Sequence, residues 1–269
     1  MHRRIPILLY HSISAQTVAA FRPWVVHPHL FAAHMRHLAE SAYETLTISE
    51  LIRATSCTGA PLPPKPVVIT FDDGFADFHE QALPVLSRHR FASTLYITTG
   101  FVGATSRWLT RQGEGNRRML TWSQIREAAC LGVECGAHSR THPALDELPL
   151  GVSRDEIRGS KTDLESQLGR EVATFAYPHG YASPKVRALV EEAGFSSAVD
   201  VRHAMSSPRD DPFGLARIIV DGNTSVAALE ALLGGWGLRR APFPEPWRTT
   251  AWRVVRHARR RATSVAWGA

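Results

Sequence analysis

The chain has 269 residues, of which 44% are hydrophobic and 21% are charged, values close to the globular average that exclude an overall disordered, collagenous or coiled-coil protein. No apolar run approaches the roughly 20 residues of a transmembrane helix, and the early apolar run at residues 5–10 is too short for a signal peptide and lacks its cleavage site. Three cysteines without Cys-x-x-Cys spacing fit a reducing compartment. We therefore expect a cytoplasmic protein with one main domain.

Short apolar segments alternate with helical patterns over residues 5–235, which is typical of a βα fold with a parallel sheet. The strands are predicted at Ile5–Tyr10, Val67–Phe71, Ala92–Ile97, Val133–Ala137, Thr174–Ala176, Ser197–Val199 and Arg217–Val220. Helices are predicted around residues 30–38 and at Ile48–Ala54, Ser123–Leu131 (N-cap Ser123), Ser153–Leu168 and Pro184–Ala193 (N-cap Ser183). Residues 101–119, rich in Gly and Arg, are expected to form a surface excursion.

The basic charge is concentrated at the end of the chain. Residues 239–269 hold eight arginines and one acidic residue, whereas the rest is nearly neutral. We predict a main domain over residues 1–237, followed by a Pro-containing linker and a basic amphipathic tail over 238–269. The tail fits a terminal helix packed on the domain and a helix lying on an anionic membrane surface equally well. A nucleic-acid partner is not expected, because the main domain carries no excess positive charge.

Three motifs follow predicted strands. In Thr70-Phe71-Asp72-Asp73-Gly74, two carboxylates can reach one cleft, where both stay ionised only beside a cation. In His138-Ser139-Arg140-Thr141-His142, two imidazoles four apart on a helical turn can reach one metal ion; with a carboxylate they form a common zinc ligand set. Phe175-Ala176-Tyr177-Pro178-His179-Gly180 predicts a tight turn that can present a backbone N–H to a carbonyl oxygen. The alternatives are an Asp-Asp-Gly turn, loop histidines and a simple strand-to-helix turn.

In this order, the three motifs resemble the signature motifs of the polysaccharide deacetylase family, also called carbohydrate esterase family four. Thr121-Trp122-Ser123, leading into residues 132–138, adds to the resemblance, which covers about residues 5–225. The resemblance implies an α/β fold that is a distorted, incomplete (β/α) TIM-like barrel. It also implies an enzyme that removes acetyl groups from N-acetylated or O-acetylated sugars by metal-assisted hydrolysis.

Residue by residue, the resemblance implies that Asp73, His138 and His142 bind one divalent metal ion. Zinc is the default ion, and Co, Ni, Mn or Fe would fit the same ligands. Asp72 would be the general base that accepts a proton from the attacking water. The backbone N–H of Tyr177 would donate to the oxyanion of the tetrahedral intermediate.

The sequence departs from the family pattern at two places. The late Leu-x-His segment, whose histidine protonates the leaving amine in many members, is missing. His11 resembles a histidine near the start of the poly-N-acetylglucosamine deacetylase branch and is the candidate for this role; a strand-end histidine bonded to a loop is the alternative. Many members carry an arginine where Ala176 stands, and Arg217 is the candidate to orient the base instead. His179 and Arg217 are also predicted to bind substrate.

The leading hypothesis is a bacterial, metal-dependent deacetylase. It would act on N-acetylated sugars of a polysaccharide or glycolipid, in the cytoplasm or at the inner membrane surface. Two alternatives stay open. One is an O-acetyl carbohydrate esterase, whose better leaving group needs a general acid less. The other is a catalytically inactive carbohydrate-binding member, which the missing histidine and Ala176 favour and the intact Asp72, Asp73, His138 and His142 oppose.

Overall fold

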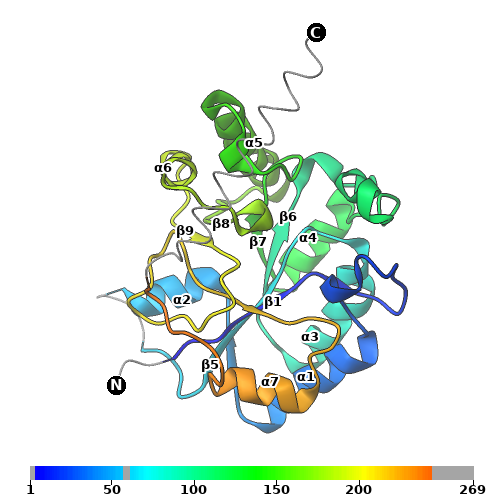
Figure 1. The fold of residues 1–269 in the computed structure, drawn as a ribbon, viewed down its shortest axis with the longest axis vertical. Coiled ribbons are helices and arrows are strands. Elements are labelled where there is room, and N and C mark those ends of the chain that lie inside the picture. Colours follow the sequence, from blue (N-terminus) through cyan, green and yellow to red (C-terminus); the bar gives the residue numbers. More distant parts are fainter. Residues whose placement is uncertain (1–3, 57–60, 244–269) are drawn as a thin grey trace.

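The computed structural model describes residues 4–56 and 61–243, which form one curled sheet with helices around its outside (Figure 1). The strands are β1 (Ile7–Tyr10), β4 (Glu44–Leu46), β5 (Pro66–Phe71), β6 (Thr94–Ile97), β7 (Glu134–Ala137), β8 (Thr174–Ala176), β9 (Ser197–Val199) and β10 (Ile218–Ile219). Their order is β10-β1-β5-β6-β7-β8-β9, with β4 beside the first half of β5, and every pair is parallel. A separate parallel pair joins β2 (Ser12–Ile13) to β3 (Val25–Val26).

The α-helices are α1 (Pro28–Glu40), α2 (Ile48–Thr55), α3 (Leu83–His89), α4 (Trp122–Cys130), α5 (Leu150–Leu168), α6 (Pro184–Glu192) and α7 (Val226–Leu233). The helices α1 to α6 each connect two successive strands, and α7 follows the last strand, β10. Short 3₁₀ turns are η1 (Arg22–Trp24), η3 (Thr99–Phe101), η4 (Arg107–Gln112), η5 (Leu145–Glu147) and η6 (Pro178–Gly180), and η2 (Phe78–Ala82) is a π-helical turn. Helices α1, α3 and α7 lie together outside one part of the barrel, and α5 and α6 lie outside the opposite part (Figure 1). Within the described ranges, no helix combines the length and apolar character that a membrane crossing requires.

The sheet curls into a barrel that is not fully closed, as the sequence predicted. Its path contains seven strands, and the end strands β9 and β10 are not paired with each other. Instead, a single bridge joins Val199 of β9 to Leu215, three residues before β10. The expected distorted, incomplete (β/α) barrel is therefore confirmed.

Alternation along the strands separates the barrel interior from its outer face. Apolar interior residues such as Val68 and Tyr96 pack with Ile48 and Leu51 of α2, which closes one end of the barrel. The N–H of Ile48 donates to the carboxylate of Glu134 at 2.9 Å, so the start of α2 is fixed to β7. With this end closed, the opposite end, at the carboxyl ends of the strands, is left for the site.

The predicted elements agree closely with the structure, because their boundary signals are local. All seven predicted strands are present, with ends displaced by at most two residues. Helix α6 begins as expected, with the Ser183 side chain accepting from the N–H of Val186. The predicted N-cap Ser123 is wrong. Thr121 caps α4, because its hydroxyl and the side chain of Gln124 form a reciprocal capping box.

Residues 101–119 are more than the surface excursion that the sequence suggested. Leu109 and Met119 are buried in a small apolar cluster with Phe21, Val25 and Phe75. The clustering ties this segment to η1 and β3, at the open end of the barrel. The correction matters because the same segment forms one wall of the site described below.

The chain remains on the main domain beyond residue 237. The N–H of Ala241 donates to the Met205 carbonyl at 2.8 Å, and Ala241 is 2% exposed. The start of the predicted linker at 238 therefore contacts the barrel. The predicted basic tail lies largely outside the described residues, from 244 onward, so its membrane contact stays a prediction.

The interior of the barrel allows no side chain at Gly136 of β7. A Cβ there would lie 2.5 Å from ring carbons of Tyr96 and 2.9 Å from a Thr174 methyl. We expect Gly136→Ala to lower the free energy of unfolding by about 1–3 kcal/mol through overpacking. Gly151→Ala is the matched control, since its Cβ would meet nothing within 4 Å, and we expect no loss there. Urea denaturation of both variants tests the prediction, and equal losses would contradict it.

Candidate active site

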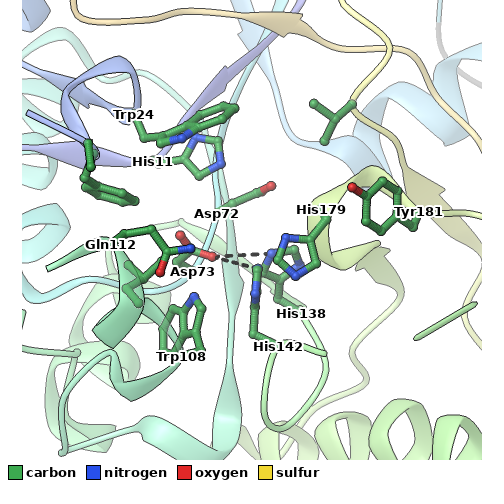
Figure 2. Close-up of a pocket in the computed structure, with 14 residues that line it drawn as sticks. His11, Trp24, Asp72, Asp73, Trp108, Gln112, His138, His142, His179 and Tyr181 are labelled. Carbon is green, nitrogen blue, oxygen red and sulfur yellow. Dashed lines mark ion pairs between the residues drawn. The ribbon is translucent and has the colours of Figure 1, made fainter. Parts of the chain in front are cut away.

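A pocket of about 270 Å³ opens at the carboxyl ends of the strands (Figure 2). The residues that line it come from the segments after β1, β5, β7, β8 and β9, from η1 and the residues just before it, and from η4. They are His11, Ala20, Phe21, Trp24, Asp72, Asp73, Trp108, Leu109, Gln112, His138, His142, His179, Tyr181 and Val201. Six of the eight residues that the sequence singled out are among them.

Asp73, His138 and His142 meet in the centre of this pocket. The Asp73 Oδ1 atom lies 3.3 Å from Nε2 of His142 and 3.5 Å from Nε2 of His138. One ligand atom from each of the three residues lies within 4.8 Å of the others. Oδ1 of Asp73 is buried, and no group in the described part of the chain donates a hydrogen bond to it. A buried carboxylate oxygen without a donor, facing two imidazoles, fits a divalent cation.

The backbone around these residues is held in unusual conformations. Asp73 has φ of 75° and His142 has φ of 58°, in the left-handed region. Such residues cost about 1–3 kcal/mol each and cluster at functional sites. The histidine pair lies in a turn rather than in the helical turn that its spacing suggested, because the N–H of His142 donates to Oγ of Ser139 at 3.0 Å.

The Nδ1 atom of His138 is held by a hydrogen bond to the sheet. Its Nδ1–H donates to the carbonyl of Ala176 at 2.8 Å, which directs Nε2 toward Asp73. Burial acts to lower the pKa of His138, but the carboxylates of Asp72 and Asp73 raise it above its usual value. Burial likewise acts to raise the pKa of Asp73, yet the adjacent imidazoles of His138 and His142 hold it well below its usual value. The site therefore favours positive charge next to Asp73.

Asp72 is held beside the cluster by a buried guanidinium. Arg217 donates to both carboxylate oxygens, with Nη1 at 2.6 Å from Oδ1 and Nη2 at 2.7 Å from Oδ2. Arg217 is fully buried, and its Nε–H donates to the carbonyl of Asp200 at 3.0 Å. Burial acts to raise the pKa of Asp72, but Arg217 and His138 lower it below its usual value. Asp72 is thus an ionised carboxylate whose orientation is fixed by a bidentate pair.

Arg217 occupies the position that the sequence suggested for orienting the base, in place of an arginine at Ala176. It does not line the pocket, because its guanidinium is fully enclosed between Asp72, Thr70 and the ring of Tyr96. The prediction that Arg217 also binds substrate therefore does not fit its place in the fold.

His11 lies on the pocket wall above Asp72, with its ring centroid 4.8 Å from that of Trp24 (Figure 2). Burial lowers the pKa of His11 below its usual value, while Asp73 and Asp72 act in the opposite direction. The structure thus brings the predicted proton donor and the predicted base into one pocket. Its role as an acid stays a prediction.

The turn after β8 contributes a different residue from the one expected. The N–H of Tyr177 donates to the Val199 carbonyl at 3.3 Å in the sheet, and its hydroxyl donates to the Phe213 carbonyl at 2.9 Å. Tyr177 does not line the pocket, so the expected oxyanion donor is corrected: this N–H is already used by β9.

His179, two residues further along the same turn, does line the pocket, with its ring centroid 4.5 Å from that of His142. Its φ of 59° turns the chain back toward the cluster. Burial lowers the pKa of His179 to about 3, helped by His142 and His138, so the ring is neutral. Because His179 lines the pocket, its predicted contact with substrate is compatible with the structure.

The aromatic walls of the pocket were missed in the sequence. Trp24 in η1 lies on one side, and Trp108 with Gln112 in η4 lies on the other (Figure 2). Both turns belong to segments without strand or long-helix periodicity. For Trp108 the available signal was an aromatic residue within a polar, Gly-containing stretch, which is a usual composition of binding loops. The stretch around Trp24 carries no such signal.

A largely enclosed arginine links the two walls. Arg117, five residues after the end of η4, donates to Oγ of Ser12 at 2.9 Å and to Oδ2 of Asp77 at 3.2 Å. Its guanidinium also lies over the rings of Phe21 and Phe75, at 5.4 and 5.6 Å from their centroids. This network links β2, η2 and both aromatic walls, so the shape of the pocket is set before any ligand binds.

Comparisons with known proteins agree with this geometry. The model of the polysaccharide deacetylase family matches residues 59–198. The Bacillus subtilis protein YxkH is 26% identical over 230 residues, covering 86% of this chain and 76% of YxkH. The poly-beta-1,6-N-acetyl-D-glucosamine N-deacetylase of Staphylococcus aureus is 20% identical over 215 residues, covering 77% of this chain and 70% of that enzyme.

A solved structure has the same fold. The Streptococcus pyogenes deacetylase PplD, in complex with acetate, superimposes with a TM-score of 0.75 and 27% identity. The superposition covers 87% of this chain and 99% of the PplD chain. The similarity therefore extends over the whole barrel and beyond the segment that the family model matches.

For the buried pair of Asp72 and Arg217, we expect removal of one partner to destabilise the fold more than removal of both charges. Arg217→Met leaves the Asp72 carboxylate buried without its partner, and we expect a loss of about 3–5 kcal/mol in unfolding free energy. Adding Asp72→Asn to Arg217→Met should recover a large part of this loss, since no buried charge then remains. Denaturant titration measures both. Arg118→Met is the control, because its pair with Glu80 is largely exposed; an Arg217→Met loss as small as the control's would count against the account.

The raised pKa of Asp77 leads us to expect that the free energy of unfolding depends on pH. Burial raises the pKa of Asp77 to about 6, although Ser12, Ile13 and Arg117 act to lower it. Its folded-state pKa lies above the unfolded value, so the stability that the protonated form contributes is lost as pH rises through about 6. Between pH 7.5 and pH 5 the wild type should therefore gain about 1 kcal/mol relative to Asp77→Asn. Unfolding free energies at both pH values test this, and a constant difference would refute it.

Proposed function

Since the chain belongs to the polysaccharide deacetylase family, we propose that it is a metal-dependent hydrolase that removes acetyl groups from N-acetylated sugars of a polysaccharide or glycolipid. The observation that carries the proposal is one pocket that holds the Asp73–His138–His142 cluster and, beside it, the separately anchored carboxylate of Asp72. Two carboxylates with different partners can take different roles, one as a ligand and the other as a base.

Asp73, His138 and His142 would hold the ion. Two imidazole nitrogens and one carboxylate oxygen are a common catalytic zinc set, and Co, Ni, Mn or Fe would fit the same donors. A bound divalent cation would polarise the acetyl carbonyl and make water a stronger nucleophile at neutral pH. The carbonyl of Ala176 keeps the ligand nitrogen of His138 directed toward Asp73.

Asp72 would accept the proton of the attacking water. Its lowered pKa keeps it ionised, and Arg217 fixes both of its oxygens at the end of β5. The base is thus held beside the ligand cluster without being part of it. A positioned carboxylate of this kind typically contributes a factor of about 10²–10⁴ to the rate.

His11 would supply the proton to the leaving amine. It lines the same pocket, and the Asp73 and Asp72 carboxylates act against the lowering of its pKa by burial. An amine leaves poorly without a proton, so an amidase depends on this donor more than an esterase does. Tyr177 has no part in this scheme, because its N–H is taken up by the sheet.

The substrate class is supported by the relatives. The Staphylococcus aureus relative is named for N-deacetylation of a poly-N-acetylglucosamine, and the PplD structure contains acetate, the acid that deacetylation releases. O-acetyl ester hydrolysis is the second candidate, favoured by one observation. The pKa of His11 is lowered by burial, which makes the imidazole less often protonated at neutral pH. An inactive carbohydrate-binding protein would have no need for the costly, buried carboxylate pair of Asp72 and Asp73.

The division of roles between the two aspartates can be tested by replacing each. Asp72→Asn should retain the metal and lose turnover by about 10²-fold or more, because only the proton acceptor is removed. Asp73→Asn should lose both metal and turnover. Metal analysis together with acetate release from N-acetylglucosamine oligomers measures both quantities, and an O-acetylated xylan assayed in parallel separates the two substrate classes. Loss of metal in Asp72→Asn would show that the roles are assigned wrongly.

A further inference from the structure

Trp108 holds a central place in the pocket that the proposed chemistry does not use. Its ring is stacked beside the proposed ligand His142, with centroids 5.3 Å apart and planes inclined by 27°. It also contacts Phe101, at 4.8 Å between centroids, and Phe75, at 6.2 Å. The indole is therefore packed on several sides, and its orientation is fixed by the apolar cluster behind it.

The indole N–H of Trp108 has no acceptor among residues 4–56 and 61–243. Nε1 is buried, yet none of the described residues places a hydrogen-bond partner within reach. An indole nitrogen can only donate, and more than about 90% of buried polar groups in folded proteins have a partner. Figure 2 shows that the nitrogen-bearing edge of the ring faces the pocket, toward Asp73 and Gln112. A bound molecule with an acceptor oxygen would complete this site.

The position of this N–H indicates which part of a substrate it meets. The acetyl group must lie where both Asp72 and the Asp73–His138–His142 cluster can reach it. Figure 2 shows Trp108 on the opposite side of Asp73 from Asp72 and His11, with Gln112 beside Asp73. An acceptor near Trp108 therefore belongs to the part of the substrate that does not react, which in an acetylated sugar carries hydroxyl and ring oxygens.

We propose that Trp108 is a substrate-specificity residue, whose indole N–H donates to an oxygen of the sugar that carries the acetyl group. This assignment rests on the proposed function. A preformed donor agrees with how firmly the segment around η4 is held: Oγ of Ser106 donates to the Glu114 carbonyl at 2.6 Å, and Leu109 of η4 is buried. A donor fixed in advance loses little entropy when the sugar binds.

The test compares Trp108→Phe with Trp236→Phe. The first removes the N–H and keeps an aromatic ring, and the second makes the same exchange at a residue that is 82% exposed and outside the pocket. On N-acetylglucosamine oligomers, Trp108→Phe should lower kcat/KM about tenfold, mainly through KM, because one hydrogen bond to the sugar is lost. On 4-nitrophenyl acetate, which has no sugar, the two variants should behave alike, and both should bind zinc as the wild type does.

A binding measurement separates this inference from the deacetylase proposal. In an Asp72→Asn background, adding Trp108→Phe should weaken oligomer binding about tenfold by calorimetry, whether or not the wild type turns the oligomer over. Should Trp108→Phe fail to fold, the indole N–H resonance of Trp108 in the wild type should still shift when oligomer is added. Three results would overturn the inference: unchanged oligomer binding, an equal loss on the ester, or loss of zinc in Trp108→Phe. Absence of acetate release by the wild type, with the binding difference intact, would instead overturn the deacetylase assignment.

Discussion

The site depends above all on one buried guanidinium. Arg217 precedes β10, the strand at one edge of the sheet, while its Nε–H donates to the carbonyl of Asp200, directly after β9 at the other edge. Its two terminal nitrogens hold Asp72 at the end of β5, with β1 between the two strands. One side chain thus links both edges of an incompletely closed barrel and fixes the carboxylate beside the metal-ligand cluster. The same side chain therefore helps to close the barrel and orients the proposed base.

The buried charges and the strained backbone of the site lower the free energy of unfolding, and packing elsewhere in the barrel offsets this loss. A buried ion pair gives up the hydration of two charges, and the left-handed backbone at Asp73 and His142 adds local strain. The apolar interior at the other end, where Ile48 and Leu51 of α2 pack against the strands, supplies burial that offsets these terms. The division is physically sensible. One end of the barrel is apolar and provides stability, and the other holds charge and provides chemistry.

How far the sequence predicts this molecule follows from the range of each signal. Strand and helix boundaries are set by neighbouring residues, so the alternation of elements and the ends of α6 are readable. The gathering of Asp73, His138 and His142 follows from parallel strands ending at the same edge. The hydrogen bond of the Tyr177 N–H could not be predicted from neighbouring residues, because its acceptor, the carbonyl of Val199, lies 22 residues later in the chain. The positions of Trp24 and Trp108 in the pocket walls could not be predicted from the sequence for the same reason. The contact between Arg117 and Asp77 joins segments that show no periodicity of their own.

The most direct test is a crystal structure with zinc, read by anomalous scattering at the zinc edge. The account predicts one strong peak at about 2.0–2.2 Å from an oxygen of Asp73 and from Nε2 of both His138 and His142. Asp72 should remain paired with Arg217 and outside the coordination sphere. A zinc ion bound by Asp72 with Arg217 displaced, or one bound outside this pocket, would contradict the account.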